Sequence, residues 1–257
     1  MKTVTKYSLD NLSMIMPILS ESEQNVMVGG TEYYYFTGSG LDQKIMYSGS
    51  VSDGYNDVLF IQDPNAGATR ENGYKPNLSE SQLEDLCQSR VVSGSANITA
   101  QHFPDPDQVG QYDPETGTIS ISIEKLTSAY ASGGNFREVL SIMNHEIAHQ
   151  GIRALVDQKF VAAFGEQWWV NHKERGVAFS ALVEYVAYSA EPTFADYAYL
   201  STAEQHNICT SATDYLNDFG NFRLGSEKAS YNQIWNDVNG SQLVNVATTF
   251  VFNNRVF

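Results

Sequence analysis

Two histidines and a glutamate lie close together near the middle of the chain, in the sequence His145-Glu146-Ile147-Ala148-His149. On a helix, residues four apart lie on the same face, so the two imidazoles can bind one metal ion. Glu146 then lies beside that ion and can take a proton from a metal-bound water. Zinc suits this set, because it binds neutral imidazole and carboxylate oxygen and keeps one position open for water in catalytic sites. The spacing therefore predicts a hydrolytic zinc site, and the alternative is a surface helix that carries two histidines by chance.

The residues around this motif predict the helix that the motif needs. Asn135 suits the N-cap, and Glu138 follows three residues later, where a carboxylate can bond back to the cap. Apolar residues then recur at helical spacing. The predicted buried face consists of Phe136, Val139, Leu140, Met143, Ile147 and Ala154. Both histidines therefore lie inside the predicted helix.

A predicted strand precedes this helix. Residues 112–117 (YDPETG) are a turn sequence, and residues 118–123 (TISISI) alternate polar and apolar side chains, which is typical of a half-buried strand. The stretch from about residue 110 to residue 155 resembles the core of the zincin metallopeptidases, in which a strand and a loop precede the metal-binding helix.

The resemblance implies roles for particular residues. His145 and His149 would bind zinc, and Glu146 would be the general base that activates water. An extended peptide substrate would bind along the strand at residues 118–123.

The third ligand distinguishes the zincin branches. The metzincin pattern continues with Gly and His, but this chain has Ile152 and Leu155 at those positions. The resemblance is therefore to the gluzincins, which take a Glu from a later helix. Glu184 is the only charged residue in the apolar segment 176–190, and a buried carboxylate without a partner is costly. A metal ion would offset that cost, so Glu184 is the predicted third ligand; the alternative is a Glu184 that is protonated or bonded to a tyrosine.

Other residues could serve the same site. Glu166, His172 and Glu174 are rival third ligands, but they lie in a polar segment that is predicted to be a connection. Asp157 is too close to the motif for a separate helix to present it. The donors that could stabilise an oxyanion are Tyr185, Tyr188, His172 and His206, and the sequence singles out none of them.

The first thirty residues contain a second pattern. Leu12 to Leu19 is not a standard secretory signal, because it is broken by Ser13 and Pro17. The residues that match another type of leader are Leu19, Ser20, Glu23, Met27, Gly29 and Gly30. They resemble bacterial double-glycine leader peptides. The resemblance implies an ABC exporter whose peptidase domain cuts after Gly30, and a secreted or periplasmic mature protein.

The composition limits the partners. The formal net charge of −15 argues against binding nucleic acid or an anionic membrane surface. No segment is long and apolar enough to insert across a membrane. A peptide or protein substrate is the expected partner. Cys87 and Cys209 could form a disulfide outside the cell or be two buried thiols.

The expected fold class is α+β, in three regions: a leader at 1–30, a β-rich region at 31–105 and a zincin-like catalytic region at 106–257. Residues 79–90 are predicted to be a helix, and the apolar segment 242–252 is either a helix or a strand. The leading hypothesis is an exported zinc metallopeptidase. The alternatives are an exported metal-binding protein without general peptidase activity and a toxin or bacteriocin-like effector.

Overall fold

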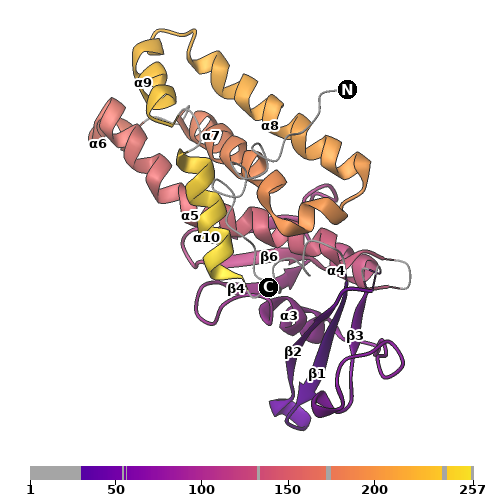
Figure 1. Cartoon of the computed structure of the whole chain (residues 1–257). Helices are drawn as coiled ribbons and strands as arrows, with labels where there is room; N and C mark the ends of the chain where they lie inside the picture. Colours follow the sequence, from indigo (N-terminus) through magenta and orange to yellow (C-terminus); the bar gives the residue numbers. More distant parts are fainter. Residues whose placement is uncertain are drawn as a thin grey trace, which may run out of the picture.

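The computed structural model describes residues 30–53, 55, 57–131, 134–171, 175–238 and 242–255. These residues form a mixed α+β structure with two small three-stranded sheets and a larger helical part. One sheet lies at one end of the molecule, the helices α5 to α10 fill the other end, and the second sheet lies between them (Figure 1). The α+β prediction is confirmed at this level. Most of the predicted leader lies outside the described residues.

The first sheet contains β1 (Thr31–Thr37), β2 (Lys44–Val51) and β3 (Val58–Phe60). The strand order is β2-β1-β3, with β2 antiparallel and β3 parallel to β1. The rings of Phe36 and Phe60 stack with centroids 4.9 Å apart, and Tyr34 packs against Phe60 in the same core. The aromatic and β-branched residues of this region thus form strands, as the sequence predicts.

The helix α3 (Glu80–Gln88) leads to the second sheet. Ser79 caps it, and Gln82 completes the capping box. Its predicted anchors Leu83, Leu86 and Cys87 are buried, so the prediction of a helix here is confirmed.

The second sheet contains β4 (Asn97–Gln101), β5 (Gly110–Asp113) and β6 (Thr118–Ser122) in the order β4-β6-β5. The side chains of Ile119 and Ile121 are buried, which confirms the predicted alternation. However, β6 pairs with a neighbour on each side, parallel to β4 and antiparallel to β5. An extended substrate therefore cannot pair with residues 118–123 as expected, and the edge strand on the side of the histidine helix is β5.

The histidines lie on the long helix α5 (Phe136–Phe164), which follows the shorter α4 (Ile123–Tyr130). The Asn135 side chain accepts a hydrogen bond from the backbone N–H of Arg137 at 3.0 Å, so the predicted cap is confirmed. The second hydrogen bond of a capping box, from the Asn135 backbone N–H to the Glu138 carboxylate, is absent. The Glu138 carboxylate binds Lys125 instead. Of the predicted buried face, Ala154 is exposed and the other members are buried.

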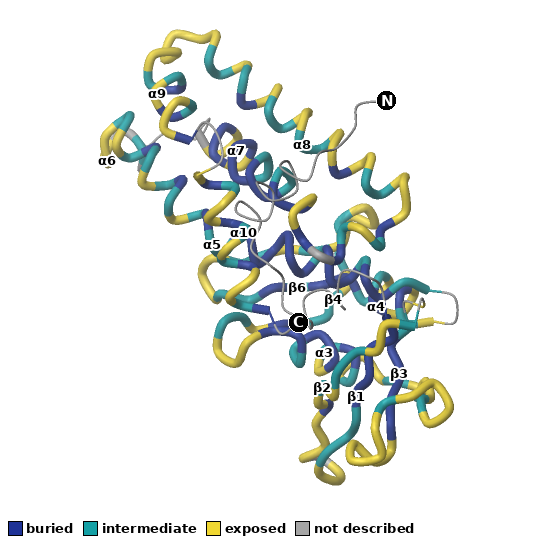
Figure 2. The backbone as a smooth tube through the Cα atoms, in the orientation of Figure 1, coloured by how far each residue is buried: buried dark blue, intermediate teal, exposed yellow. Residues whose placement is uncertain are grey.

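The remaining helices pack around α5. They are α6 (Glu166–Asn171), α7 (Arg175–Ala190), α8 (Thr202–Phe222), α9 (Lys228–Val238) and α10 (Gln242–Asn254), with short 3-10 turns at Glu191–Thr193 and Ala195–Tyr199 between α7 and α8. The C-terminal apolar segment is thus a helix. Both α7 and α10 contact α5, and buried residues concentrate along α5, α7 and β6 (Figure 2). Among the described residues, no helix combines the length and apolarity needed to cross a lipid bilayer.

The two cysteines do not form a disulfide. Cys87 is buried on α3, whereas Cys209 lies exposed on α8, and both thiols are free. Burial raises the pKa of the Cys87 thiol, so this group is an inert part of the core.

A buried ionic network fixes the start of α5. The guanidinium of Arg137 lies 3.1 Å from the Glu32 carboxylate on β1 and 2.8 Å from Asp196 in the second 3-10 turn. Asp196 also pairs with Arg255 near the C-terminus at 2.5 Å. Asn144, next to the first histidine of the motif, bonds to Asp196 at 3.1 Å. The network therefore joins three distant segments to the helix that carries the histidines.

Candidate metal centre

Three predicted ligands converge in the middle of the molecule. His145 and His149 lie one turn apart on the buried part of α5, and Glu184 reaches them from α7. Oε2 of Glu184 lies 3.2 Å from Nε2 of His145 and 3.4 Å from Nε2 of His149. The two Nε2 atoms lie 2.8 Å apart. These three ligand atoms therefore form a small triangle.

The triangle is close to the size that zinc requires. Zinc binds nitrogen and oxygen at about 2.0–2.1 Å, and tetrahedral geometry then separates two ligand atoms by about 3.3 Å. The two distances from Glu184 match this value. The two imidazoles would have to separate by only about 0.5 Å for the set to accept the ion. The residues present thus fit a zinc ion, with a fourth position left for a substrate or water.

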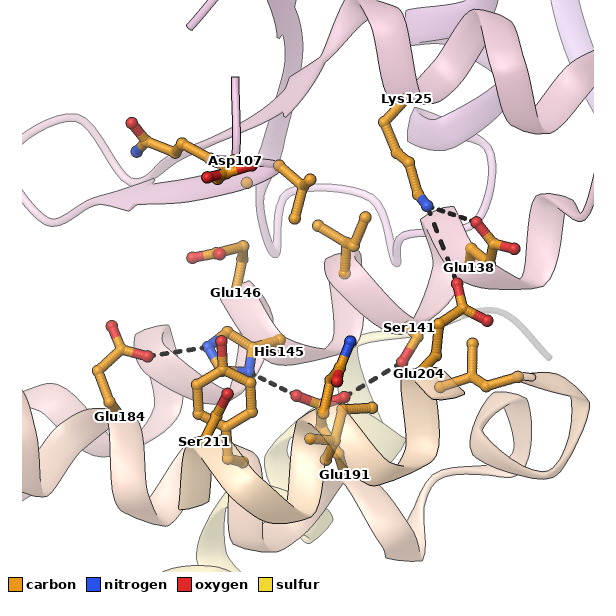
Figure 3. Close-up of a pocket in the computed structure, with 18 of the residues that line it drawn as sticks. Asp107, Lys125, Glu138, Ser141, His145, Glu146, Glu184, Glu191, Glu204 and Ser211 are labelled. Carbon is orange, nitrogen blue, oxygen red and sulfur yellow. Dashed lines mark hydrogen bonds and ion pairs between the residues drawn. The ribbon is translucent and has the colours of Figure 1, made fainter. Parts of the chain in front are cut away.

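Glu191 is a functional candidate that the sequence reasoning missed. Its Oε1 lies 2.8 Å from Nδ1 of His145, and its Oε2 accepts a hydrogen bond from the Ser141 hydroxyl at 3.3 Å. Glu184 and Glu191 approach the two nitrogens of His145 from opposite sides (Figure 3). A carboxylate on Nδ1 fixes the tautomer that leaves Nε2 available for a metal. The sequence does contain a hint, because Glu191 directly follows the apolar segment 176–190. The structure shows that its side chain is buried.

The electrostatics of the cluster favour a cation between these residues. Burial opposes a charge on His145, but hydrogen bonds to Glu184 and Glu191 outweigh burial and raise its pKa to about 10. Burial raises the pKa of Glu184, but hydrogen bonds from His145 and His149 outweigh it and hold the pKa well below its usual value. The two carboxylates therefore favour a positive charge at His145, and a metal cation would supply that charge.

Glu146 lies directly under the edge strand β5. A Cβ on Gly110 would lie 2.9 Å from Oε1 of Glu146 and 2.7 Å from Cγ2 of Ile142, so only glycine allows this approach. The backbone N–H of Tyr112 also donates to the Glu146 carboxylate. Burial raises the pKa of Glu146, and the nearby histidines and this N–H only partly oppose burial. A raised pKa suits a carboxylate that takes up and returns a proton.

A cleft of about 600 Å³ opens beside Glu146 on the side toward the start of α5. Its polar wall contains Asp107, Glu138 and Glu204. Lys125 also lines the cleft, but its ammonium lies between the carboxylates of Glu138 and Glu204, the latter at 3.9 Å (Figure 3). The cleft therefore carries a net negative charge and offers no unpaired cation.

The donors considered for an oxyanion lie in different places. Tyr188 lines the cleft, and its ring centroid lies 4.3 Å from that of His145. Tyr185 packs against Trp235 instead, with centroids 5.7 Å apart. His206 is exposed on α8, outside the cleft. Of the described candidates, Tyr188 alone is placed to donate to a group bound at the histidines.

The rival third ligands do not approach the cluster in the part of the chain that the structure describes. Glu166 is exposed at the start of α6. Asp157 accepts a hydrogen bond from the Trp169 indole. His172 and Glu174 lie outside the described residues.

Comparison with protein-family models, with curated proteins and with solved structures finds no match to this chain.

Proposed function

We propose that this protein is a zinc-dependent metallopeptidase with a gluzincin-like site, in which His145, His149 and Glu184 hold the metal. The observation that carries the proposal is the approach of Glu184 to both histidine Nε2 atoms, at 3.2 and 3.4 Å, across more than thirty residues of sequence. A chance pair of histidines on a helix needs no carboxylate from a second helix, and the Glu184 side chain is only partly exposed, at 29%. The Glu191 contact to His145 adds the outer support that is typical of metal sites.

Bound zinc would supply Lewis-acid chemistry, which polarises a substrate carbonyl and makes water easier to deprotonate. Glu146 takes the proton from water and returns it to the leaving amine nitrogen. The Tyr188 hydroxyl donates to the carbonyl oxygen as its negative charge develops. Burial raises the pKa of Tyr188, so this hydroxyl keeps its proton at neutral pH and remains a donor.

The edge of β5 is where an extended peptide could bind. The Ser122 N–H donates to the Val109 carbonyl at 3.0 Å, so Val109 faces β6. Backbone groups alternate along an antiparallel strand, so those of Gly110 and Tyr112 point to the opposite edge, above Glu146. A peptide added at this edge would present its carbonyl groups to the candidate metal centre.

Metal content and hydrolysis test the proposal together. The purified chain should bind about one zinc and cleave a mixture of fluorescence-quenched peptides, and a chelator should stop cleavage. Glu146→Gln should abolish cleavage and keep zinc, whereas Glu184→Ala should lose zinc. Glu115→Gln, in an exposed turn, is the matched control and should change neither.

Two results would contradict the proposal. Unchanged cleavage by E146Q would remove the assigned base, and full zinc affinity in E184A would remove the third ligand. Zinc binding without hydrolysis of any peptide would favour the alternative of an exported metal-binding or effector protein.

We also propose that the protein reaches the outside of the cytoplasm through an exporter that removes residues 1–30. Gly30 directly precedes β1, so cleavage there would leave the first sheet whole. The Thr31 backbone N–H and hydroxyl bond to the two oxygens of Asp53, at 3.1 and 2.7 Å, which would hold a new N-terminus in place.

A further inference from the structure

A second cavity, of about 470 Å³, lies farther along α5, on the other side of the histidines from the acidic cleft. Its walls come from the end of β5, from α5 and α6, and from the start of α7. Aromatic rings of Trp169 and Phe179 form part of the wall, and Arg153 supplies its cation. Asp157 also lines the cavity, so its charges balance, whereas the first cleft carries an excess of carboxylates.

Arg153 has no carboxylate partner among the described residues. Its guanidinium lies over the Phe179 ring, 5.0 Å from the centroid. Asp157, one turn along the helix, accepts a hydrogen bond from the Trp169 indole instead. By contrast, Arg70 and Arg137 each form an ion pair, at 2.7 and 2.8 Å to their nearest carboxylates. The guanidinium of Arg153 thus keeps its donors for a ligand, beside aromatic rings that lower the local polarity, so that an anion pairs with it more strongly than in open water.

The cavity is aligned with the candidate metal centre. Glu146, Gln150 and Arg153 follow one another on one face of α5, at the spacing i, i+4 and i+7. The strand β5 runs along the same face, with Gly110 against Glu146 and Tyr112 at the second cavity. Seven residues of helix rise about 10 Å, which is the length of about three residues of extended peptide.

We propose that this cavity is a substrate subsite for an acidic side chain about three residues from the scissile bond, with Arg153 as the group that binds its carboxylate. The inference rests on the proposed function. The net negative charge of the first cleft repels a substrate carboxylate, and Lys125 there is already paired with Glu138 and Glu204. An acidic residue is therefore accepted on one side of the scissile bond only.

Peptides of one neutral sequence, with Glu or Gln placed three residues before or three residues after the cleaved bond, test the subsite. For one of the two placements, the wild-type protein should cleave the Glu peptide about tenfold better in kcat/KM than its Gln partner. Arg153→Gln should remove this preference, so that kcat/KM for the Glu peptide falls to about that for the Gln peptide. Lys159→Gln is the matched control, because it removes one positive charge from the same helix outside the cavity. A preference that survives in R153Q, or equal cleavage of all four peptides by the wild type, would overturn the proposal.

A binding measurement separates this inference from the proposed function. Fluorescence anisotropy with labelled Glu and Gln peptides on E146Q should show the same preference, and the double variant with R153Q should lose it. If the wild type cleaves no peptide, the proposed function fails, while this binding result still decides the subsite. Equal binding of both peptides by E146Q would show that Arg153 does not select a carboxylate.

Discussion

Nδ1 of His145 lies 2.8 Å from Oε1 of Glu191, in a contact between residues 46 apart in the sequence. The contact fixes the imidazole on the side away from the candidate metal position, so that Nε2 faces His149 and Glu184. Glu191 is buried and its other oxygen accepts a bond from Ser141, so neither oxygen is free to turn away. Glu191, which is not itself one of the three predicted ligands, thus sets the orientation of the His145 ring.

Replacing Glu191 should weaken the metal site without removing a ligand. Glu191→Gln keeps the size of the side chain but removes its charge, so zinc affinity should fall by about tenfold to a hundredfold. Competition with a fluorescent chelator measures this change. Glu166→Gln, on the exposed start of α6, is the control and should bind zinc like the wild type. Equal affinities for all three proteins would mean that Glu191 does not support the site.

The contact between β5 and Glu146 should depend on the absence of a side chain at residue 110. Gly110→Ala would place a Cβ within 2.7–2.9 Å of Ile142 and Glu146, so either the Glu146 side chain or the strand must shift. A displacement of about 1 Å near reacting groups costs up to about a hundredfold in rate, so kcat/KM should fall within that range while zinc stays bound. Gly220→Ala on α8 is the control, because a Cβ there meets nothing within 4 Å. Wild-type activity in G110A would show that this approach does not position Glu146.

The buried ionic network should make folding sensitive to acid. Burial alone would raise the pKa of Asp196, but Arg255 and Arg137 outweigh burial and hold the pKa well below its usual value of 3.8. A depressed carboxylate pKa gives stability that is present above the unfolded pKa and is lost as the pH falls through the folded one. Asp196→Asn should therefore lower the free energy of unfolding at pH 7 by about 3–5 kcal/mol.

Urea unfolding at several pH values checks this prediction. The difference between wild type and D196N should shrink below about pH 4, where the unfolded wild type gains its proton. Asp42→Asn, at an exposed residue, should change the free energy of unfolding by less than about 0.5 kcal/mol. A pH-independent difference for D196N would contradict the ionic origin of the effect.

Cleavage after Gly30 should strengthen the contact at Asp53. In the chain of residues 31–257, the N-terminal ammonium of Thr31 would replace the amide that now bonds to Asp53 at 3.1 Å. Asp53→Asn should then destabilise this shorter chain more than the full chain, by about 1.5 kcal/mol, because the donor it loses is a charged ammonium instead of a neutral amide. Thermal unfolding of the four proteins measures the difference. Equal losses in both lengths would show that the new N-terminus does not pair with Asp53.

The features that were predicted correctly from the sequence depend on residues that lie close together in the chain. The N-cap at Asn135, the one-turn spacing of His145 and His149 and the alternation of β6 depend on neighbours only a few residues away, because backbone geometry fixes the period of a helix or a strand. Glu184 lies beside both histidines, as expected for a lone carboxylate in an apolar helix that needs a partner, and its role as a metal ligand stays a prediction. Glu138 shows the limit of local reasoning, since Lys125 from another helix takes the carboxylate that a capping box would use.

Tertiary structure decided everything that depends on contacts between distant segments. The sequence by itself determined the two histidines, the glutamate between them and the helix that carries all three. Only the fold placed β5 at the sheet edge, set Glu191 behind His145 and left Arg153 without a carboxylate partner among the described residues. The physical reason is that such contacts follow from how the buried faces of helices and sheets pack together, and no short stretch of residues specifies that packing.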